Sequence, residues 1–419
     1  MKVSHMAENL IGSEIIKLAQ EINEKISKGE KIYNLTIGDF NPKVFPIPAE
    51  FKQEIIRAFE EDETNYPVPN GMPALRKAIS HFLSRRMGAS YNEQEILVSG
   101  GARPLIYSLY RAVVDEGDTV VYPAPSWNNN HYTQMLGARA ISVETRPENN
   151  FMPTAEDLAE HLGEATLLSL CSPLNPTGTV FTRQALQDIC KLVAEENDRR
   201  QNEGRKPLYL MYDQIYWTLT HGETQHFDPV SVQPSLRPYC IFIDGMSKSF
   251  AATGVRIGWA FGPEKIIQDM KSILSHVGAW SPKAEQIAAA RYLMNDDAID
   301  RYLNTFKSEI MARLEGFYTG FMDLKKDGFP VDAIAPQAAI YLTIQVDLTG
   351  KQLPDGTVVS ETSQTTQYLL NKAKLGLVPF NCFGSSQDST WYRLSVGTCT
   401  LQDVQDAIAS LRNALSQLK

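Results

Sequence analysis

The stretch DGMSKSFAATGVRIGW, residues 244–259, is the most informative part of the sequence for both fold and chemistry. An apolar run ends in a Gly/Ser turn that presents Lys248, and Arg256 follows eight residues later. A lysine that forms a Schiff base needs a rigid position and a lowered pKa, which burial and nearby cations provide. Arg256 suits a phosphate group. Taken alone, the turn suits a surface lysine as well.

Short apolar runs alternate with helical segments around this stretch. The expected strands cover residues 95–100, 119–125, 138–144, 166–173, 207–213 and 239–247, and amphipathic helices are expected at 103–115 and 183–196. This alternation predicts right-handed crossovers and a mostly parallel sheet with helices on both faces. Ligands bind such sheets at the carboxyl ends of the strands, where many of the distinctive residues lie. The charged run 195–206 is expected to be a solvated helix end and loop.

The two ends of the chain follow a different pattern. Further strands are expected within 329–347 and 390–396, a polar hairpin with an Asp-Gly turn at 349–364, and a final helix at 401–418. Helical spacing near the N-terminus predicts an amphipathic helix through Ile15, Ile16, Leu18, Ile22 and Ile26. We therefore expect a large domain at 46–315 and a small domain built from 1–45 and 316–419.

Composition narrows the class of protein. The chain has 419 residues, of which 43% are hydrophobic and 21% charged, as in ordinary globular proteins of two domains. A net charge of -9 gives no support for nucleic-acid binding. We expect no signal peptide and no membrane span, and hence a cytoplasmic location. The five cysteines lack a C-x-x-C pair and are expected to be buried, with no disulfide framework and no metal site.

Two polar residues close the apolar strand PLYLMYDQIYW, residues 207–217. Asp213 stands at the end of the strand, and Tyr216 follows it by three residues. A buried carboxylate beside a pyridine nitrogen keeps that nitrogen protonated, and a phenol nearby can bind a ring hydroxyl. A strand-end aspartate also commonly caps a helix, so this motif alone leaves both interpretations open.

Three more strand ends suit a planar, phosphorylated ligand. The amide of Asn175, in CSPLNPTGTVF, can donate to a ring hydroxyl or a carboxylate. The backbone of Gly101, Ala102 and Arg103, in a strand–Gly-Gly–helix segment, can bind a phosphate. Trp127, in VVYPAPSWNNN, can stack on a ring. Each motif alone is also compatible with an ordinary turn, helix start or packed tryptophan.

The order of these motifs resembles the class I/II aminotransferases, the pyridoxal 5′-phosphate (PLP) enzymes of the aspartate aminotransferase superfamily. The resemblance extends from IGDFNP at 37–42 to YRLSVG at 392–397, and the lysine motif is its most specific part. It implies the α/β architecture called fold type I. In that fold, a large domain has a mostly parallel, seven-stranded sheet covered by helices on both faces, and both chain ends form a smaller α+β domain.

The same resemblance implies PLP as cofactor and a role for each matching residue. Lys248 would bind PLP and move a proton, with Asp213 and Tyr216 as further catalytic residues. The expected cofactor-binding residues are Gly101, Ala102, Arg103, Trp127, Asn175, Asp213, Tyr216, Ser247, Lys248 and Arg256, together with Tyr66 from a neighbouring subunit. The expected substrate-binding residues are Gly38, Asn175 and Arg393, the last of which would grip the α-carboxylate. A homodimer with shared active sites is implied, with amino acids and 2-oxo acids as substrates and neither nucleic acid nor membrane as partner.

Two departures from the family pattern leave the substrate open. Gly245 stands where many relatives have a phosphate-binding serine, three residues before the lysine. The segment HVGAW carries His276 and Trp280 but no arginine for a distal carboxylate. Arg111 is a hypothetical substitute, although a solvent-facing helix position explains it equally, and Trp280 suits either an apolar substrate wall or a subunit contact.

The resemblance implies ping-pong transfer of an amino group from an L-amino acid to a 2-oxo acid, with 2-oxoglutarate as the expected acceptor. Another PLP reaction on the same scaffold, such as β-elimination by a C–S lyase, remains an alternative. A non-catalytic effector-binding module is a second alternative, but it would need a DNA-binding domain before residue 33.

Overall fold

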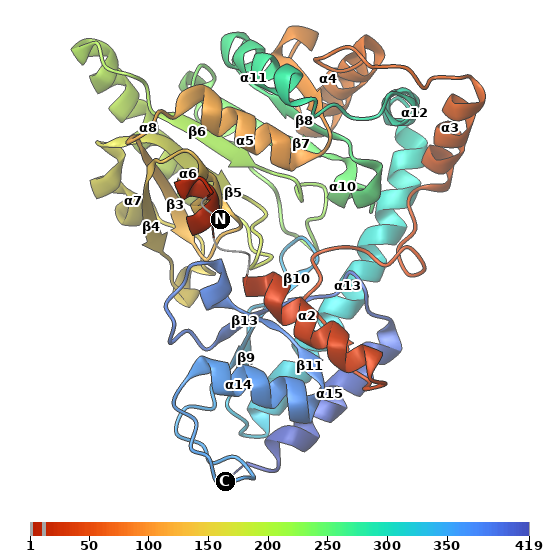
Figure 1. The fold of residues 1–419 in the computed structure, drawn as a ribbon, viewed down its shortest axis with the longest axis vertical. Coiled ribbons are helices and arrows are strands. Elements are labelled where there is room, and N and C mark those ends of the chain that lie inside the picture. Colours follow the sequence, from red (N-terminus) through yellow and green to blue (C-terminus); the bar gives the residue numbers. More distant parts are fainter. Residues whose placement is uncertain (1–2, 11–13, 419) are drawn as a thin grey trace.

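The computed structural model describes residues 3–10 and 14–418 and contains a seven-stranded sheet and a smaller four-stranded sheet (Figure 1). The large sheet has the order β2-β8-β7-β6-β5-β3-β4, and only β8 runs antiparallel to its neighbours. Its strands are β2 (Ile96–Ser99), β3 (Thr119–Ala124), β4 (Arg139–Glu144), β5 (Ala165–Cys171), β6 (Tyr209–Asp213), β7 (Cys240–Gly245) and β8 (Gly258–Phe261). The predicted α/β class with a mostly parallel sheet is confirmed.

Each of the six expected strands overlaps an observed one, but β8 was not among them. Its four residues, Gly258–Phe261, overlap the end of the lysine motif and extend two residues beyond it. The strand is short, and it returns antiparallel between β2 and β7, where a parallel crossover would need a long connection. Its presence places the lysine turn directly beside the start of the helix that follows β2.

Helices cover both faces of the large sheet, as alternate residues on its strands show. On β7, Ile241 and Ile243 join the apolar core under α5 (Ala102–Val113) and α11 (Glu264–Val277). Phe242 joins the opposite core, which is filled mainly by four longer helices. Those are α4 (Pro73–Met87), α7 (Ala155–Leu162), α8 (Arg183–Glu203) and α12 (Lys283–Leu293). Shorter or peripheral helices are α3 (Ala49–Glu60), α6 (Asn129–Met135), α9 (Pro229–Val232) and α10 (Met246–Ser249).

The second unit packs around an antiparallel sheet of order β12-β13-β10-β9. Its strands are β9 (Val331–Ala333), β10 (Tyr341–Val346), β12 (Val378–Pro379) and β13 (Trp391–Ser395), and a parallel pair joins β1 (Tyr33–Asn34) to β11 (Leu375–Gly376). The pair β1–β11 brings the N-terminal segment into this unit. The surrounding helices are α2 (Glu14–Ser27), α14 (Thr362–Tyr368) and α15 (Leu401–Leu415), while α1 (His5–Asn9) lies near the large sheet (Figure 1).

A long helix, α13 (Asp296–Lys326), runs between the two units (Figure 1). Ile299 near its start packs in the core of the large sheet, whereas Phe306 and Leu314 pack in the second core. The expected boundary at residue 315 therefore falls inside a helix that both cores share. The division of the chain into two domains at that point stays a prediction.

Several local expectations need refinement. The N-terminal helix is present as α2, with Ile22 buried and Ile26 exposed; the side chains of Ile15 and Ile16 lie outside the described residues. The expected hairpin at 349–364 is present but short: cross-strand backbone hydrogen bonds join 350–353 to 357–359 around the Gln352–Val358 bridge, and α14 begins at Thr362. A polar segment this short makes too few cross-strand contacts to extend the ladder.

The prediction that residues 195–206 are wholly solvated is wrong at two positions. Asn197 is buried and exchanges hydrogen bonds of 2.9 and 2.8 Å with the backbone of Leu208. Arg200 is buried and donates to the Leu162 carbonyl oxygen at 2.7 Å, as well as to Glu196. These polar residues satisfy backbone groups at the ends of neighbouring elements, a role that charge patterning does not reveal.

Among the described residues no disulfide forms, no cluster of side chains suits a metal ion, and no helix is long and apolar enough to cross a membrane. Cys190, Cys240 and Cys399 are buried as expected. Cys171 and Cys382 are only partly buried.

The lysine turn packs tightly against β8. A side chain at Gly245 would place its Cβ 2.7 Å from the Ile257 carbonyl oxygen and 2.8 Å from the Gly258 Cα. Both contacts are with backbone, which cannot move aside without opening the β7–β8 pair. Position 245 therefore accepts a side chain only at a cost in packing.

We predict that Gly245→Ser lowers the free energy of unfolding by about 1–3 kcal/mol, the usual cost of overpacking. Urea denaturation measures it. The matched control is Gly254→Ser, because a Cβ there meets nothing within 4 Å. Equal stability of the two variants would contradict the packing argument.

Candidate active site

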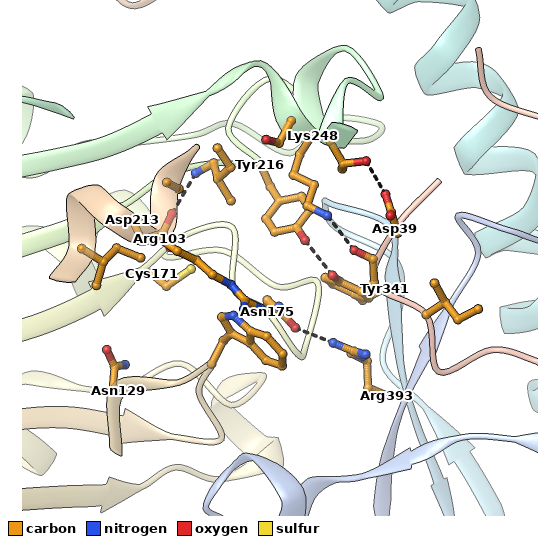
Figure 2. A pocket seen from close by; sticks show the side chains of 18 of the residues that line it. Asp39, Arg103, Asn129, Cys171, Asn175, Asp213, Tyr216, Lys248, Tyr341 and Arg393 are labelled. Atoms are coloured by element: carbon orange, nitrogen blue, oxygen red, sulfur yellow. Dashed lines mark hydrogen bonds between the residues drawn. The ribbon is translucent and has the colours of Figure 1, made fainter. Parts of the chain in front are cut away.

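A cavity of about 660 Å³ lies where the carboxyl ends of β5, β6 and β7 face the second unit (Figure 2). The parallel register aligns Cys171 with Asp213 and Asp213 with Ile243, so polar residues just after these strands converge. Twelve of the expected site residues line the cavity: Gly38, Ala102, Arg103, Trp127, Asn175, Asp213, Tyr216, Ser247, Lys248, Arg256 and Arg393 directly, and Gly101 through its contact with Arg256.

Lys248 projects into this cavity from the short helix α10 (Figure 2). Its Nζ donates to the Gly38 carbonyl oxygen at 2.6 Å. Burial lowers the pKa of Lys248 to about 8, against the opposing effect of Asp39 and with help from nearby arginines, chiefly Arg393. A substantial fraction of the amine is therefore neutral, and nucleophilic, near physiological pH.

Asp213 lies across the cavity at the end of β6. Its carboxylate accepts a hydrogen bond of 3.1 Å from the Ile215 amide, and no other hydrogen bond reaches it from the described residues. Burial raises its pKa to about 6. A buried carboxylate with one hydrogen bond has lost most of the stabilisation that water gives to its negative charge. A cationic N–H partner would restore that stabilisation.

Arg393, on β13 of the second unit, is buried at the opposite wall. Its Nη1 donates to Asn175 Oδ1 at 2.9 Å and its Nη2 to the Thr36 carbonyl oxygen at 2.6 Å. Its Nε is buried without a hydrogen-bond partner among the described residues, and burial lowers its pKa. A guanidinium stays cationic in proteins even when it is buried, and that of Arg393 lines the cavity, which suits a carboxylate ligand.

One end of the cavity offers donors for an anion. Gly101 has a φ of 99° at the start of α5, and a Cβ there would collide with the Arg256 guanidinium. Arg256 donates to the Thr253 and Gly100 carbonyl oxygens at 2.6 and 2.8 Å, which aims it at the start of that helix. Helix amides and an arginine at one point make an anion site. Ser247 lines the same cavity, whereas Gly245 contributes no side chain.

Trp127 and Arg103 lie face to face, with the guanidinium carbon 5.4 Å from the ring centroid. Both side chains line the same cavity as Asp213 and Arg393. An indole at this place can cover one face of a flat ligand.

Sequence reasoning missed several lining residues, three of which make hydrogen bonds that shape the cavity. Tyr341 bonds the Tyr216 hydroxyl at 2.6 Å, Asp39 accepts from Thr253 Oγ1 at 2.7 Å, and Asn129 accepts from Tyr110 and Ser169, both at 2.9 Å. In the sequence, Tyr341 looks like any other residue of a buried strand, so its context does not indicate a role in the cavity. Asn129 had a weak signal, because it follows Trp127 in a run of three asparagines.

Four residues considered for the site lie elsewhere in the chain's own fold. Tyr66 is 83% exposed and packs edge to face on Trp280 with ring centroids 5.4 Å apart, in a second, smaller hollow. Arg111 is exposed at the last turn of α5 and does not line the Lys248 cavity. His276 lies in the last turn of α11, also outside it.

The residues present fit PLP. The anion site suits a phosphate, and Asp213 lacks the cationic partner that a protonated pyridine nitrogen supplies. Lys248 provides a buried amine of lowered pKa. The guanidinium of Arg393, which also lines the cavity, remains for a substrate carboxylate.

Comparison with known proteins agrees with this fit. A model of the family "Aminotransferase class I and II" matches residues 30–411. An aspartate aminotransferase from Bacillus sp. (strain YM-2) is 29% identical over 97% of each chain. An aspartate/prephenate aminotransferase from Thermus thermophilus is 30% identical over 75% of this chain and 77% of its own.

Solved structures give the same result for the fold. The aspartate aminotransferase from Rhizobium meliloti superposes with a TM-score of 0.91 at 23% identity and covers 100% of both chains. The Thermus thermophilus aspartate aminotransferase with maleate gives a TM-score of 0.86 at 25% identity, covering 99% of this chain and 100% of its own. The chain therefore belongs to the class I and II aminotransferases and is a PLP-dependent enzyme that transfers an amino group from an amino acid to a 2-oxo acid.

Proposed function

We propose that this aminotransferase takes its amino group from an acidic amino acid, aspartate first, and passes it to 2-oxoglutarate. The observation that carries the reaction type is the arrangement of one cavity, in which the amine of Lys248 lies between Asp213 and Arg393. Several relatives along the whole chain are aspartate aminotransferases, which supports the donor. The lining cations Arg103, Lys248, Arg256 and Arg393 outnumber the lining carboxylates, which favours anionic ligands in this cavity.

Lys248 is the proposed proton carrier. With a pKa near 8, the neutral Nζ of Lys248 can accept the proton from the substrate Cα. The ammonium form can then donate that proton back to the reacting atoms. PLP, when bound, supplies the electron sink that makes this Cα proton acidic. The Gly38 carbonyl oxygen, which accepts from Nζ at 2.6 Å, holds the amine in the cavity when it is not attached to the cofactor.

The remaining residues bind and orient. Asp213 would hold the pyridine nitrogen in its protonated form, and Tyr216 and Asn175 would bind the ring oxygen. Arg393 would take the α-carboxylate, with Asn175 fixing the guanidinium at 2.9 Å. Gly38 leaves room beside that carboxylate, because a Cβ there would approach Tyr341 Oη to 2.7 Å.

Ser247 and Arg256 would hold the phosphate together with the amides of Gly101, Ala102 and Arg103. Trp127 would cover the ring. Because Gly245 has no side chain, we propose that Ser247 replaces the phosphate contact that a serine at position 245 makes in many relatives.

We further propose that the protein acts as a homodimer with Tyr66 reaching the neighbouring subunit's phosphate site. Support comes from the 83% exposure of Tyr66 and from its place outside the Lys248 cavity of its own chain. The cytoplasmic location stays a prediction. Neither β-elimination nor a non-catalytic effector-binding role gains support, since the full-length relatives are named aminotransferases.

An amino-donor screen with 2-oxoglutarate tests the substrate. We predict that aspartate gives the highest kcat/KM and that no ammonia is released, as β-elimination would require. Arg393→Lys lowers kcat/KM for aspartate by about 10- to 100-fold, because a charge-assisted hydrogen bond contributes about 1.5–3 kcal/mol. Arg111→Ala is the matched control and leaves kcat/KM for aspartate unchanged, since Arg111 lies outside the cavity. Preference for an aromatic or aliphatic donor would overturn the acidic-donor proposal, whereas a strong loss in Arg111→Ala would contradict the placement of Arg111 outside the site.

Hybrid dimers test the shared site. Lys248→Ala and Tyr66→Ala homodimers should both be strongly impaired. A purified hybrid, carrying one chain of each kind with different tags, contains one site with Lys248 and the neighbouring Tyr66 both intact. We therefore predict that the hybrid regains up to about half of the wild-type rate. If the hybrid stayed at the level of the Tyr66→Ala protein, Tyr66 would act within its own chain.

A further inference from the structure

A second buried tyrosine, Tyr341, shares the cavity with Tyr216 although it belongs to the other sheet. Tyr341 starts β10, and only 1% of its surface is exposed. The two hydroxyl oxygens are 2.6 Å apart, and the rings meet edge to face with centroids 5.5 Å apart (Figure 2). The two units are therefore joined inside the cavity by one short hydrogen bond between phenols.

Tyr341 is also fixed from two other sides. The guanidinium carbon of Arg393 lies 4.7 Å from the Tyr341 ring centroid, within the range of a cation–π contact. Gly38 approaches so closely that a Cβ there would lie 2.7 Å from Tyr341 Oη. The phenol therefore has little freedom to turn, and its hydroxyl stays directed at Tyr216.

The direction of this hydrogen bond matters for the cavity. A phenol has a single proton, so one of the two hydroxyls donates and the other accepts. Burial raises the pKa of both tyrosines, that of Tyr216 well above its ordinary value. The charge of Arg393 lowers the pKa of both, chiefly that of Tyr341, whose ring it contacts. The more acidic hydroxyl is the better donor, which favours Tyr341 as donor and Tyr216 as acceptor. The Tyr216 proton is then free for a second partner.

We propose that Tyr341 is a positioning residue that donates to the Tyr216 hydroxyl and thereby directs the Tyr216 proton into the cavity, toward the ring oxygen of bound PLP. The inference rests on the role proposed above for Tyr216. The ring and the hydroxyl of Tyr341 then have two separate functions. The ring supports Arg393, and the hydroxyl acts through Tyr216 alone, since no other hydrogen bond from the described residues reaches it.

Tyr341→Phe separates these parts, because it keeps the ring beside Arg393 and removes only the hydroxyl. Without the Tyr341 donor, Tyr216 is a weaker and less directed donor to the ring oxygen. The variant should therefore bind PLP about five-fold more weakly, the equivalent of one ordinary hydrogen bond. The pH midpoint of the bound cofactor's absorbance change should rise, because negative charge on the ring oxygen loses stabilisation. Both quantities are measured without any amino acid.

Two comparisons show whether the hydroxyl acts through Tyr216. Tyr392→Phe is the matched control: Tyr392 is a buried tyrosine of the same sheet, whose hydroxyl lies 3.3 and 3.4 Å from groups of Thr366 and Thr362. It should leave both PLP affinity and the midpoint unchanged. In a Tyr216→Phe background, Tyr341→Phe should have no further effect on either quantity.

Three results would overturn the proposal: a midpoint and PLP affinity in Tyr341→Phe equal to wild type, the same shift in Tyr392→Phe, or a full effect of Tyr341→Phe in the Tyr216→Phe background. The last two would show a packing effect. Because the readouts need only PLP, a protein that bound PLP but transferred no amino group would refute the proposed reaction without touching this result.

Discussion

The cavity depends on two ionisable groups that burial holds far from their ordinary pKa values. Asp213 is raised to about 6 and Lys248 is lowered to about 8, both mainly by loss of contact with water. Neither has an ion-pair partner among the described residues that would explain its burial as structural. Charged groups are seldom buried in this way without a ligand to compensate them. The fold maintains this arrangement because three parallel strands end at the same level, with Cys171, Asp213 and Ile243 in register.

The second unit completes the cavity rather than merely covering it. Four of the hydrogen bonds between the two units lie at the cavity: Lys248 to the Gly38 carbonyl, Arg393 to Asn175, Thr253 to Asp39, and the pair Tyr216–Tyr341. Each joins a residue of the large-sheet unit to one near β1, β10 or β13. The amine, the carboxylate-binding arginine and the ring-binding phenol are therefore oriented by contacts between the units. A change in the relative position of the two units would move the amine, the arginine and the phenol together. The shape of the cavity and its chemistry therefore depend on the same contacts.

Much of this could be predicted from the sequence, because strand ends carry short-range signals. Lys248 and Asp213 each follow an apolar run, and the order of the motifs identified the family. Long-range contacts gave no such signal. Tyr341 lies in an apolar strand and differs from its neighbours only by its contact with Tyr216, 125 residues away. Arg200 looked like part of a solvated charge run and proved to be buried. The short antiparallel strand β8 was missed because no long helix separates it from β7, so it does not follow the alternation of strands and helices that identified the others.

The central claim is that Lys248 is the amine that binds PLP and that burial has made it reactive. The most direct measurement is the rate at which apo-protein incorporates PLP as a function of pH, with the attached lysine identified by peptide mass after borohydride reduction. The neutral amine is the nucleophile, so the rate should rise with pH and level off above about 8 at Lys248 alone. Asp39→Asn should move the midpoint lower, because Asp39 favours the ammonium form. Attachment to another lysine, or a rate that continues to rise toward the ordinary lysine value of 10.5, would contradict the account.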